Sequence, residues 1–434
     1  MICPLDYRYG REIVKSIFRE ESRFRKMITV EIALLKALEE MNVVPKGESE
    51  KVAKVAEKIS PEEIKEVERI TRHDVMALVE VLSKKSSCSY VHLGATSNDI
   101  VDTAIALQLK EFFEILEDDM KRLIRTLMNL SLKYRKTAML GRTHGQAALP
   151  ITFGWKVAGY LAEFLRHYER MVEIKKRVVV GKMMGAVGTG ASFKELGVEP
   201  SQVSKKVGEI LGINMDECPT QIVARDRYIE FVNFMANIAC SSEKIATEIR
   251  NLQRPEIGEV AEAFSPNQVG SSTMPHKKNP VTSENICGLA RIVRGFVTPM
   301  YESSILWHER DLSNSSAERF IIPHICVLID DILNKLNEVL SNIVVNEERM
   351  LQNLLMHPEI LAERLMIYLV KKGYSRQEAH RIMREISASG DIKKEFTERF
   401  GEVPEELFDP TKYIGDSERI AMDIVKKAKE IIGE

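Results

Sequence analysis

Long segments without glycine or proline constrain the fold of this chain more than any other feature. Residues 95–140 contain neither residue, and apolar side chains recur on most faces of the helix they would form. A continuous helix of about 40 residues would be roughly 60 Å long at 1.5 Å per residue. Further long runs of helical character span 150–180, which contains two glycines, and 220–254, and a fourth starts near Glu284 and bends at Pro299. Such helices, apolar nearly all round, are normally buried inside a bundle or an oligomer.

The pattern predicts an all-α protein of three helical domains. Residues 1–93 form an N-terminal domain of shorter helices, with a capping box at Ser60–Glu63. Residues 94–345 form the central domain of long helices. Residues 346–434 form a small C-terminal helical domain with a second capping box at Ser375–Glu378.

Two finer predictions concern close packing and strands. Gly154 and Gly159 lie in the second long run, where the absence of a side chain would let another helix approach closely. Few segments alternate as strands do, and the most plausible is a short hairpin at residues 178–188.

Composition excludes several classes of protein. The 434 residues carry a net charge of −2, so there is no general attraction to nucleic acid or to anionic membranes. The N-terminal residues are polar and lack the apolar core of a signal peptide, and the apolar stretch 320–329 is interrupted by Pro323. Six cysteines are scattered without paired spacing, as in reduced cytosolic proteins. We therefore expect a soluble cytoplasmic protein that binds neither nucleic acid nor a membrane.

Three polar loops separate the predicted long helices. They read HLGATSND (92–99), GRTHGQ (141–146) and GSSTMPHKKNPVTSEN (270–285), and each combines glycine with hydroxyl groups and a cation or imidazole. Any one of them alone is more simply explained as a helix cap. Three loops of the same chemistry weaken that explanation and indicate a shared site.

The residue types in these loops suit proton transfer. The chain lacks a GxxxxGK[ST] loop, GxGxxG, HExxH, GxSxG and paired Cys–His spacing, so the usual motifs of nucleotide hydrolysis, metal catalysis and serine hydrolysis are missing. Histidine, serine and lysine remain. With them, a base can remove a C–H proton, an acid can protonate a leaving group and a cation can stabilise the carbanion, without a cofactor or metal.

The segment GSSTMPHKKNP closely resembles the central motif of the fumarase/aspartase superfamily, whose members cleave C–N or C–O bonds and release fumarate. Within it, the chain is similar to the adenylosuccinate lyases. The segments TRHDV (71–75), GATSND, GRTHGQ, TQIVARDR (220–227), MPHKKNP and LWHERDLSNSSAER (306–319) resemble those of that family in its order. The resemblance covers nearly the whole chain.

The resemblance implies catalytic roles for several residues. Ser271 is expected to be the base, with its alkoxide favoured by Lys277, although Ser271 and Ser272 could exchange roles. His144 is expected to be the general acid, with Glu284 as the carboxylate that pairs with it. His92 is a further active-site histidine that we place in the catalytic group, and whether it transfers a proton stays open.

The resemblance also implies a set of substrate-binding residues. They would hold the phosphate, nucleotide and carboxylates of the substrate, and they are Arg8, Tyr9, Arg72, His73, Asp74, Thr96, Ser97, Gln221, Ser272, Asn279, Arg310, Ser315 and Arg319.

The resemblance further implies β-elimination of fumarate from adenylosuccinate and from the succinylated aminoimidazole carboxamide ribotide. It also implies a homotetramer whose long helices form a shared core and whose sites are built from several subunits. Argininosuccinate lyase and carboxymuconate cycloisomerase are the enzymatic alternatives, and a catalytically silent helical scaffold is the alternative from another class. The RHD and SSAER segments match positions that hold the nucleotide in the adenylosuccinate lyases. They disfavour argininosuccinate lyase and carboxymuconate cycloisomerase, because the substrates of those two enzymes have no nucleotide phosphate.

Overall fold

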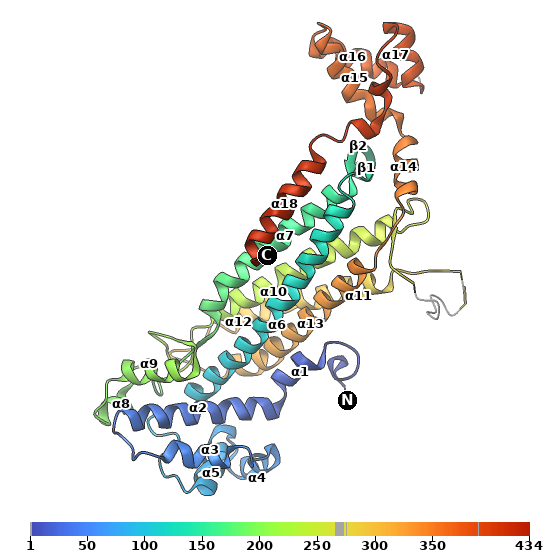
Figure 1. Ribbon diagram of the computed structural model, residues 1–434. Coiled ribbons are helices and arrows are strands. Elements are labelled where there is room, and N and C mark those ends of the chain that lie inside the picture. Colours follow the sequence, from blue (N-terminus) through green and yellow to red (C-terminus); the bar gives the residue numbers. More distant parts are fainter. Residues whose placement is uncertain (1, 265–272, 275, 389) are drawn as a thin grey trace. The chain divides into compact units, whose positions relative to one another are not determined.

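The computed structural model describes residues 2–264, 273–274, 276–388 and 390–434 (Figure 1). Helices dominate it, as predicted. The chain forms two compact units, each assembled from three segments. The first unit comprises Met1–Asp119, Tyr168–Cys240 and Leu289–Leu333, and the second comprises Met120–His167, Ser241–Gly288 and Asn334–Glu434. The predicted division into three domains stays a prediction.

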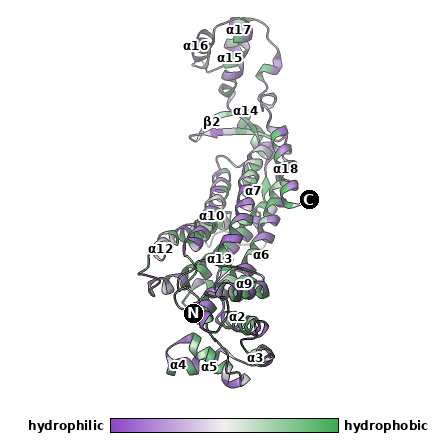
Figure 2. Cartoon of the chain, turned by 90° about the vertical axis from the view of Figure 1, so that its left-hand side faces the viewer, coloured by the Kyte–Doolittle hydropathy of each residue, from purple (hydrophilic) through white to green (hydrophobic). Residues whose placement is uncertain are grey.

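The four long runs of the sequence are helices, as predicted. They are α6 (Ser97–Lys133), α7 (Phe153–Val178), α10 (Asp226–Leu252) and α11 (Val281–Gly295). The helix α6 has 37 residues and is therefore about 55 Å long. Figure 2 shows hydrophobic and hydrophilic residues interleaved along α7 and α10, as expected for helices that pack on some faces and meet water on others.

One proline position differs from the sequence-based expectation, and a second lies inside a helix. The fourth run breaks at Phe296, and Pro299 lies inside the first turn of α12 (Val297–Glu302), where its missing N–H needs no partner. Pro323, which interrupts the apolar stretch 320–329, lies inside α13 (Ser313–Ser341) without ending the helix. The apolar residues that follow Pro323 are fully buried, so packing maintains this helix across the proline.

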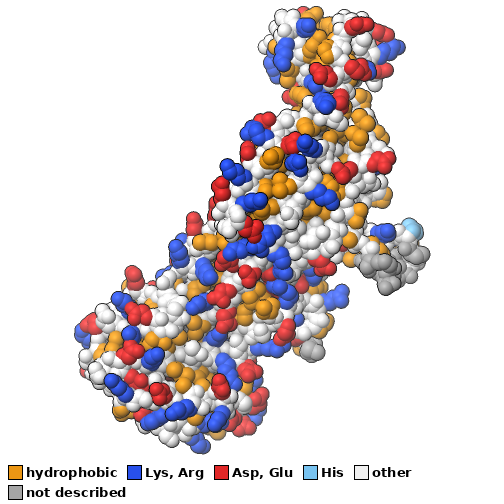
Figure 3. All heavy atoms as spheres, in the orientation of Figure 1, with side chains coloured by type: hydrophobic (Ala, Val, Ile, Leu, Met, Phe, Trp, Pro, Cys, Tyr) orange, Lys and Arg blue, Asp and Glu red, His pale blue; other side chains and the backbone are white. Residues whose placement is uncertain are grey.

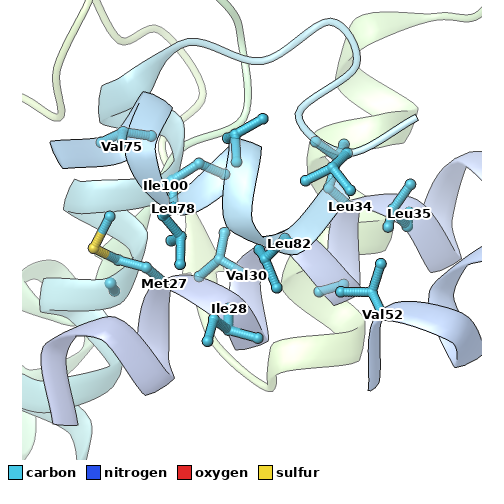
Figure 4. Close-up of a cluster of buried hydrophobic side chains, with 14 of the residues drawn as sticks. Met27, Ile28, Val30, Leu34, Leu35, Val52, Val75, Leu78, Leu82 and Ile100 are labelled. Atoms are coloured by element: carbon cyan, nitrogen blue, oxygen red, sulfur yellow. The ribbon is translucent and has the colours of Figure 1, made fainter. Parts of the chain in front are cut away.

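The first unit contains a layer of short helices packed on α2 (Glu20–Glu40). These are α3 (Glu48–Ala56), α4 (Pro61–Thr71), α5 (Asp74–Ser86) and α9 (Pro200–Leu211), preceded by η1 (Pro4–Asp6) and α1 (Glu12–Phe18), with α8 (Ala191–Glu195) beside α9. The capping box at Ser60–Glu63 is confirmed, with both reciprocal hydrogen bonds present. Figure 4 shows side chains of α2 such as Val30 meeting Leu78 and Leu82 of α5, which joins the layer through one apolar core.

The second unit contains a β-hairpin and the C-terminal helices. The strands β1 (Ala138–Thr143) and β2 (Gln146–Thr152) are antiparallel, and α14 (Glu347–Leu355) packs on β1. The remaining elements are β5 (Val260–Ala261) paired with β6 (Val344–Val345), the helices α15 (Ala362–Lys371), α16 (Arg376–Ser387), α17 (Ile392–Phe400) and α18 (Ser417–Ile432), and the short turns η2 (Pro358–Leu361), η3 (Glu405–Phe408) and η4 (Pro410–Lys412). Ser375 caps α16 by accepting from the backbone N–H of Glu378.

The predicted hairpin at residues 178–188 is wrong. That segment contains only the two-residue strand β3 (Val180–Gly181), which pairs in parallel with β4 (Asn214–Met215). The true hairpin lies at the end of the first long run, because the tight turn at His144–Gly145 joins two strands there.

The surface carries mixed charge. On the face shown in Figure 3, lysine and arginine side chains are interspersed with aspartate and glutamate, which agrees with the net charge of −2. Among the described residues, no helix is long and apolar enough to cross a membrane.

The close-packing prediction for the two glycines is right at one position. A Cβ at Gly154 would lie 2.4 Å from the carbonyl oxygen of Ser131 and 2.5 Å from the backbone of Arg135, whereas a Cβ at Gly159 would meet nothing within 4 Å. Backbone atoms cannot rotate away as a side chain can, so Gly154 is required by the packing of its own chain.

Gly154→Ala should therefore lower the free energy of unfolding by about 1–3 kcal/mol through overpacking. Gly159→Ala is the matched control in the same helix, and within one chain it should be neutral or slightly stabilising, since alanine is the better helix former. Chemical denaturation of both variants measures the difference. Equal stability of the two variants would contradict the packing described here.

Candidate active site

A cationic cavity of about 260 Å³ lies within the first unit. Its wall includes Arg23 of α2, Arg310, and Ser315 and Arg319 of α13, together with Asn98 of α6. Four arginines line the cavity, the fourth being Arg225, against the carboxylates of Glu20, Asp102 and Glu318. The lining therefore carries one excess positive charge, which favours an anionic ligand. Of these residues, the sequence predicted Arg310, Ser315 and Arg319, and the structure brings these three together.

Arg310 carries a charge that no carboxylate in contact neutralises. Its Nη1 donates to Oε1 of Gln221 at 3.0 Å and its Nη2 donates to Oγ of Ser315 at 2.9 Å, both neutral acceptors. Its Nε is buried without a hydrogen-bond partner among the described residues. Burial lowers the pKa of Arg310, while Asp102 and Glu318 oppose that shift from a greater distance. The two neutral acceptors fix the guanidinium without neutralising it, and such a charge suits a phosphate or carboxylate.

A buried arginine, Arg225, holds this wall in place. Its guanidinium donates to both carboxylate oxygens of Asp102 on α6, at 2.6 and 3.0 Å, and to both of Glu318 on α13, at 2.8 and 3.0 Å. The backbone N–H of Val223 adds a bond of 2.8 Å to Asp102. These bonds fix the segment containing Gln221 between the two helices that carry the cavity residues. Arg225 is a positioning residue that the sequence reasoning did not identify.

The predicted residues at 72–74 lie where α4 ends and α5 begins. Arg72 adopts the left-handed conformation that ends α4, and its side chain is exposed. Nδ1 of His73 accepts from the backbone N–H of Met76 at 3.4 Å, so the neutral ring carries its proton on Nε2. That nitrogen lies 3.4 Å from Oγ of Ser97. The structure therefore joins the RHD segment to the start of α6.

Asp74 is held ionised by two arginines of the same unit. Burial opposes its ionisation, but the hydrogen bond from Arg23 at 2.5 Å, with a smaller contribution from Arg319, keeps its pKa below the ordinary value. Arg23 was missed by the sequence reasoning, since an arginine on an amphipathic helix gives no signal of its own.

The loop before α6 is tied to a buried ion pair. Asp99 accepts from the backbone N–H of Thr96 at 2.8 Å, as an N3 residue does in a capping box. The carboxylate of Asp99 also pairs with Lys182, and both side chains are fully buried. At the other end of this loop, Nδ1 of His92 lies 2.6 Å from Oε1 of Glu31 on α2.

The N-terminal residues Arg8 and Tyr9 precede a segment whose backbone is hydrogen-bonded to α13. The backbone N–H groups of Gly10 and Arg11 donate to Asp331 and Asp330 of α13 at 3.1 and 3.2 Å. A Cβ on Gly10 would lie 2.1 Å from Val327, so glycine is required at this approach. Arg8 itself is exposed.

His144 lies at the tip of the hairpin in the second unit. His144 and Gly145 are the two turn residues between β1 and β2, with φ of +54° and +76°, as a type I′ turn requires. Arg142 anchors the hairpin through two bonds to the buried carboxylate of Glu259, at 2.7 and 3.0 Å. His144 is exposed and makes no hydrogen bond to any described residue.

The cationic segment before α11 also belongs to the second unit. Lys277 is exposed, without an ion pair among the described residues, and Glu284 is exposed in the first turn of α11. The segment with Asn279 is held by the side-chain amide of Gln253, which donates to the carbonyl of Lys278 at 3.0 Å, while Glu262 caps α11 through the backbone N–H of Ser283 at 2.6 Å. Ser271 and Ser272 lie outside the described residues.

The structure thus places the predicted site residues in two groups. The first unit holds most of the substrate-binding residues together with His92, and the second holds His144, Lys277, Asn279 and Glu284. The predicted pairing of His144 with Glu284 is not made within one chain. No group of three His, Cys, Asp or Glu side chains in the described part of the chain could hold a metal ion.

Comparisons with known proteins assign the family. Residues 10–295 match the family model described as lyase. Adenylosuccinate lyase from Archaeoglobus fulgidus is 43% identical over 445 residues, covering all of both chains. That from Pyrococcus horikoshii is 43% identical over 449 residues, covering all of this chain and 98% of the other. The chain belongs to the adenylosuccinate lyase family.

Solved structures agree with this family's fold. The 3-carboxy-cis,cis-muconate lactonizing enzyme from Pseudomonas putida is similar with a TM-score of 0.88 and 29% identity, covering 99% of each chain. A fumarate lyase from Mesorhizobium sp. BNC1 is similar with a TM-score of 0.85 and 30% identity, covering 96% of this chain and 99% of that one. The predicted fold class is confirmed.

The buried network around Arg225 predicts a stability difference. Arg225→Met would leave Asp102 and Glu318 buried without their partner, and should cost about 3–5 kcal/mol of unfolding free energy. Arg177→Met is the matched control, since Arg177 pairs with Glu230 on the surface of the same unit, and it should cost less than about 1 kcal/mol. Urea denaturation measures both. Similar losses for the two variants would show that the Arg225 network is not a buried determinant of this unit.

Proposed function

We propose that this lyase eliminates fumarate from adenylosuccinate to give AMP, and from the succinylated aminoimidazole carboxamide ribotide to give the carboxamide ribotide. The observation that carries the proposal is the identity of 43% to an adenylosuccinate lyase over the whole of both chains. A role in purine nucleotide synthesis also fits the cytoplasmic location expected from the sequence.

The cationic cavity supports a nucleotide substrate. Adenylosuccinate carries a phosphate and two carboxylates, so its pocket needs several cations although the chain as a whole is slightly acidic. Arg310, which donates to two neutral acceptors, and Arg319 are suited to the phosphate, and Arg8 would approach from the anchored N-terminal segment. His73, Ser97 and Gln221 would supply polar contacts to the nucleotide.

The proposed chemistry is a pair of proton transfers. The Ser271 alkoxide removes the proton from the succinyl carbon next to the one that bears nitrogen. The electron pair of that C–H bond forms the double bond of fumarate, and the pair of the C–N bond leaves with the nitrogen, which takes a proton from His144. Lys277 and Asn279 would bind the succinyl carboxylate on which negative charge develops. This sequence requires no redox or metal cofactor.

We further propose that the site forms in a homotetramer from several subunits. The segment 92–97 precedes α6 and the hairpin with His144 follows it, and a helix of 37 residues is about 55 Å long. One small substrate cannot touch groups at both ends of such a helix. Antiparallel packing of long helices from neighbouring chains would bring His144 of one chain to the Arg310 cavity of another. Glu284 would then meet His144 across a subunit boundary.

A second candidate activity is the cycloisomerisation of carboxymuconate. The likeness to the Pseudomonas putida enzyme, at 29% identity, favours it. The higher identity to adenylosuccinate lyases disfavours it.

The first test is fumarate release by the purified protein. Adenylosuccinate should be cleaved, measured by the absorbance change on conversion to AMP, while argininosuccinate and 3-carboxy-cis,cis-muconate should be inert because neither has a phosphate for Arg310 and Arg319. Turnover of either alternative with no cleavage of adenylosuccinate would overturn the proposed function.

Subunit exchange tests the shared site. His144→Ala and Ser271→Ala should each lose several orders of magnitude in turnover while the fold is kept. If the two residues of one site come from different chains, an exchanged equal mixture should regain about a quarter of the wild-type sites by symmetry counting. Native mass spectrometry confirms that hybrids have formed, and unmixed parents are the controls. Hybrids as inactive as the parents would mean that both residues come from one chain.

A further inference from the structure

Glu31 is an unusual residue for the position it occupies. It lies in the middle of α2, its side chain is fully buried, and Ile28, Val30 and Leu34 around it belong to the apolar core of the first unit. Figure 4 shows these neighbours between α2 and α5. A buried carboxylate is costly unless a charged or hydrogen-bonding partner compensates it. The residue that compensates the charge of Glu31 therefore indicates the role of Glu31.

Both oxygens of Glu31 bind the same residue, His92. Oε1 lies 2.6 Å from Nδ1 of the ring, and Oε2 accepts from the backbone N–H of His92 at 3.0 Å. Within the described part of the chain, Glu31 makes no other hydrogen bond. These two contacts fix the backbone of His92 and the orientation of its ring. The buried carboxylate of Glu31 therefore interacts with His92 alone among the described residues.

The backbone of His92 is in a conformation that residues other than glycine rarely adopt. Its φ is +66°, in the left-handed region, which costs of order 1–3 kcal/mol for a residue with a side chain. Glycine would remove that cost, and the chain places glycine two residues later at Gly94. A strained histidine held by a dedicated carboxylate, in the loop that leads into α6, is typical of a functional position.

The surroundings of the ring favour its charged form. Burial opposes protonation, but Glu31 on α2 outweighs it, and Asp99 on α6 adds to the effect, so the pKa of His92 is raised above its ordinary value. Asp99 is itself paired with Lys182. With the Nδ1 proton directed to Glu31, Nε2 is the ring nitrogen left to bind a ligand, since no described residue bonds to it.

We propose that Glu31 is a positioning residue that holds His92 as an oriented imidazolium for the anionic substrate. The inference rests on the proposed function and adds a specific role for a residue outside the substrate's reach. His92 then offers a positive charge and a free Nε2 to the substrate, and Glu31 acts through His92 without touching the substrate.

Glu31→Gln tests this role, because the amide keeps the size of the side chain and removes its charge. The kcat/KM for adenylosuccinate should fall by about 10- to 100-fold, chiefly through KM, as expected for a misplaced contact group. Losing the carboxylate lowers the pKa of His92, so the alkaline limb of the profile of kcat/KM against pH should move to lower pH. If Glu31 only stabilised the fold, its replacement would leave the alkaline limb of this profile at the same pH.

The matched control is Glu359→Gln. Glu359 lies 2.8 Å from Nδ1 of His357 in an exposed pair outside the proposed site, and its loss should leave KM and the pH profile unchanged. In a His92→Asn background, Glu31→Gln should cause no further loss, since its effect passes through His92. An unshifted pH profile in Glu31→Gln, or losses that add in the double variant, would overturn the proposal.

A readout that does not depend on turnover separates this proposal from the proposed function. NMR titration of histidine-labelled protein, assigned with His92→Asn, should give a raised pKa for His92 that falls in Glu31→Gln. If Glu31→Gln does not fold, Glu31→Asp replaces it, and its shorter side chain should raise KM while His92 stays charged. A wild-type His92 that titrates at or below its ordinary pKa would contradict the role of Glu31, whereas a wild type inert toward adenylosuccinate would contradict the proposed function alone.

Discussion

The cavity that carries Arg310 and Arg319 depends on the buried guanidinium of Arg225. Its side chain bridges Asp102 of α6 and Glu318 of α13 through four hydrogen bonds of 3.0 Å or less, and the backbone N–H of Val223 adds a fifth bond to Asp102. Desolvated ion pairs of this kind contribute little to stability on balance, but breaking one of them is costly. Here these ion pairs fix the positions of the neighbouring side chains. Arg310 and the hydroxyl of Ser315 are held in hydrogen-bonding contact beside this network, so the charge offered to a ligand is fixed before the ligand arrives.

Helix length imposes the second constraint. The residues that would bind the nucleotide and those that would transfer protons lie in different units of the chain, and each group is well anchored by itself. Asp99 and Glu31 secure the loop before α6, and Glu259 secures the hairpin that carries His144. Neither group has the full set of charges that the elimination needs. The proposed assembly of several chains would complete one site from such elements, and it would bring partners to His144 and Glu284, which are exposed in a single chain.

Local patterns predicted much of this molecule, and tertiary contacts account for what was missed. The long helices and the cap at Ser60 follow from the absence of breakers and from short-range hydrogen bonding, so the sequence alone sufficed. The strands at His144 were missed because a histidine in a type I′ turn is a weak hairpin signal. Glu31 and Arg225 gave no sequence signal, since what distinguishes them is burial against partners far along the chain. Residues within recognisable motifs could be singled out from the sequence, whereas these two positioning residues could not.

The central claim is that one active site draws on more than one chain. A structure of the assembled protein with AMP and fumarate bound, determined by crystallography or cryo-electron microscopy, tests it most directly. The account predicts AMP phosphate on Arg310 and Arg319 of one subunit, with His144 and Lys277 reaching the same site from neighbouring subunits. A site in which Arg310, His144 and Lys277 all come from the same chain would contradict it.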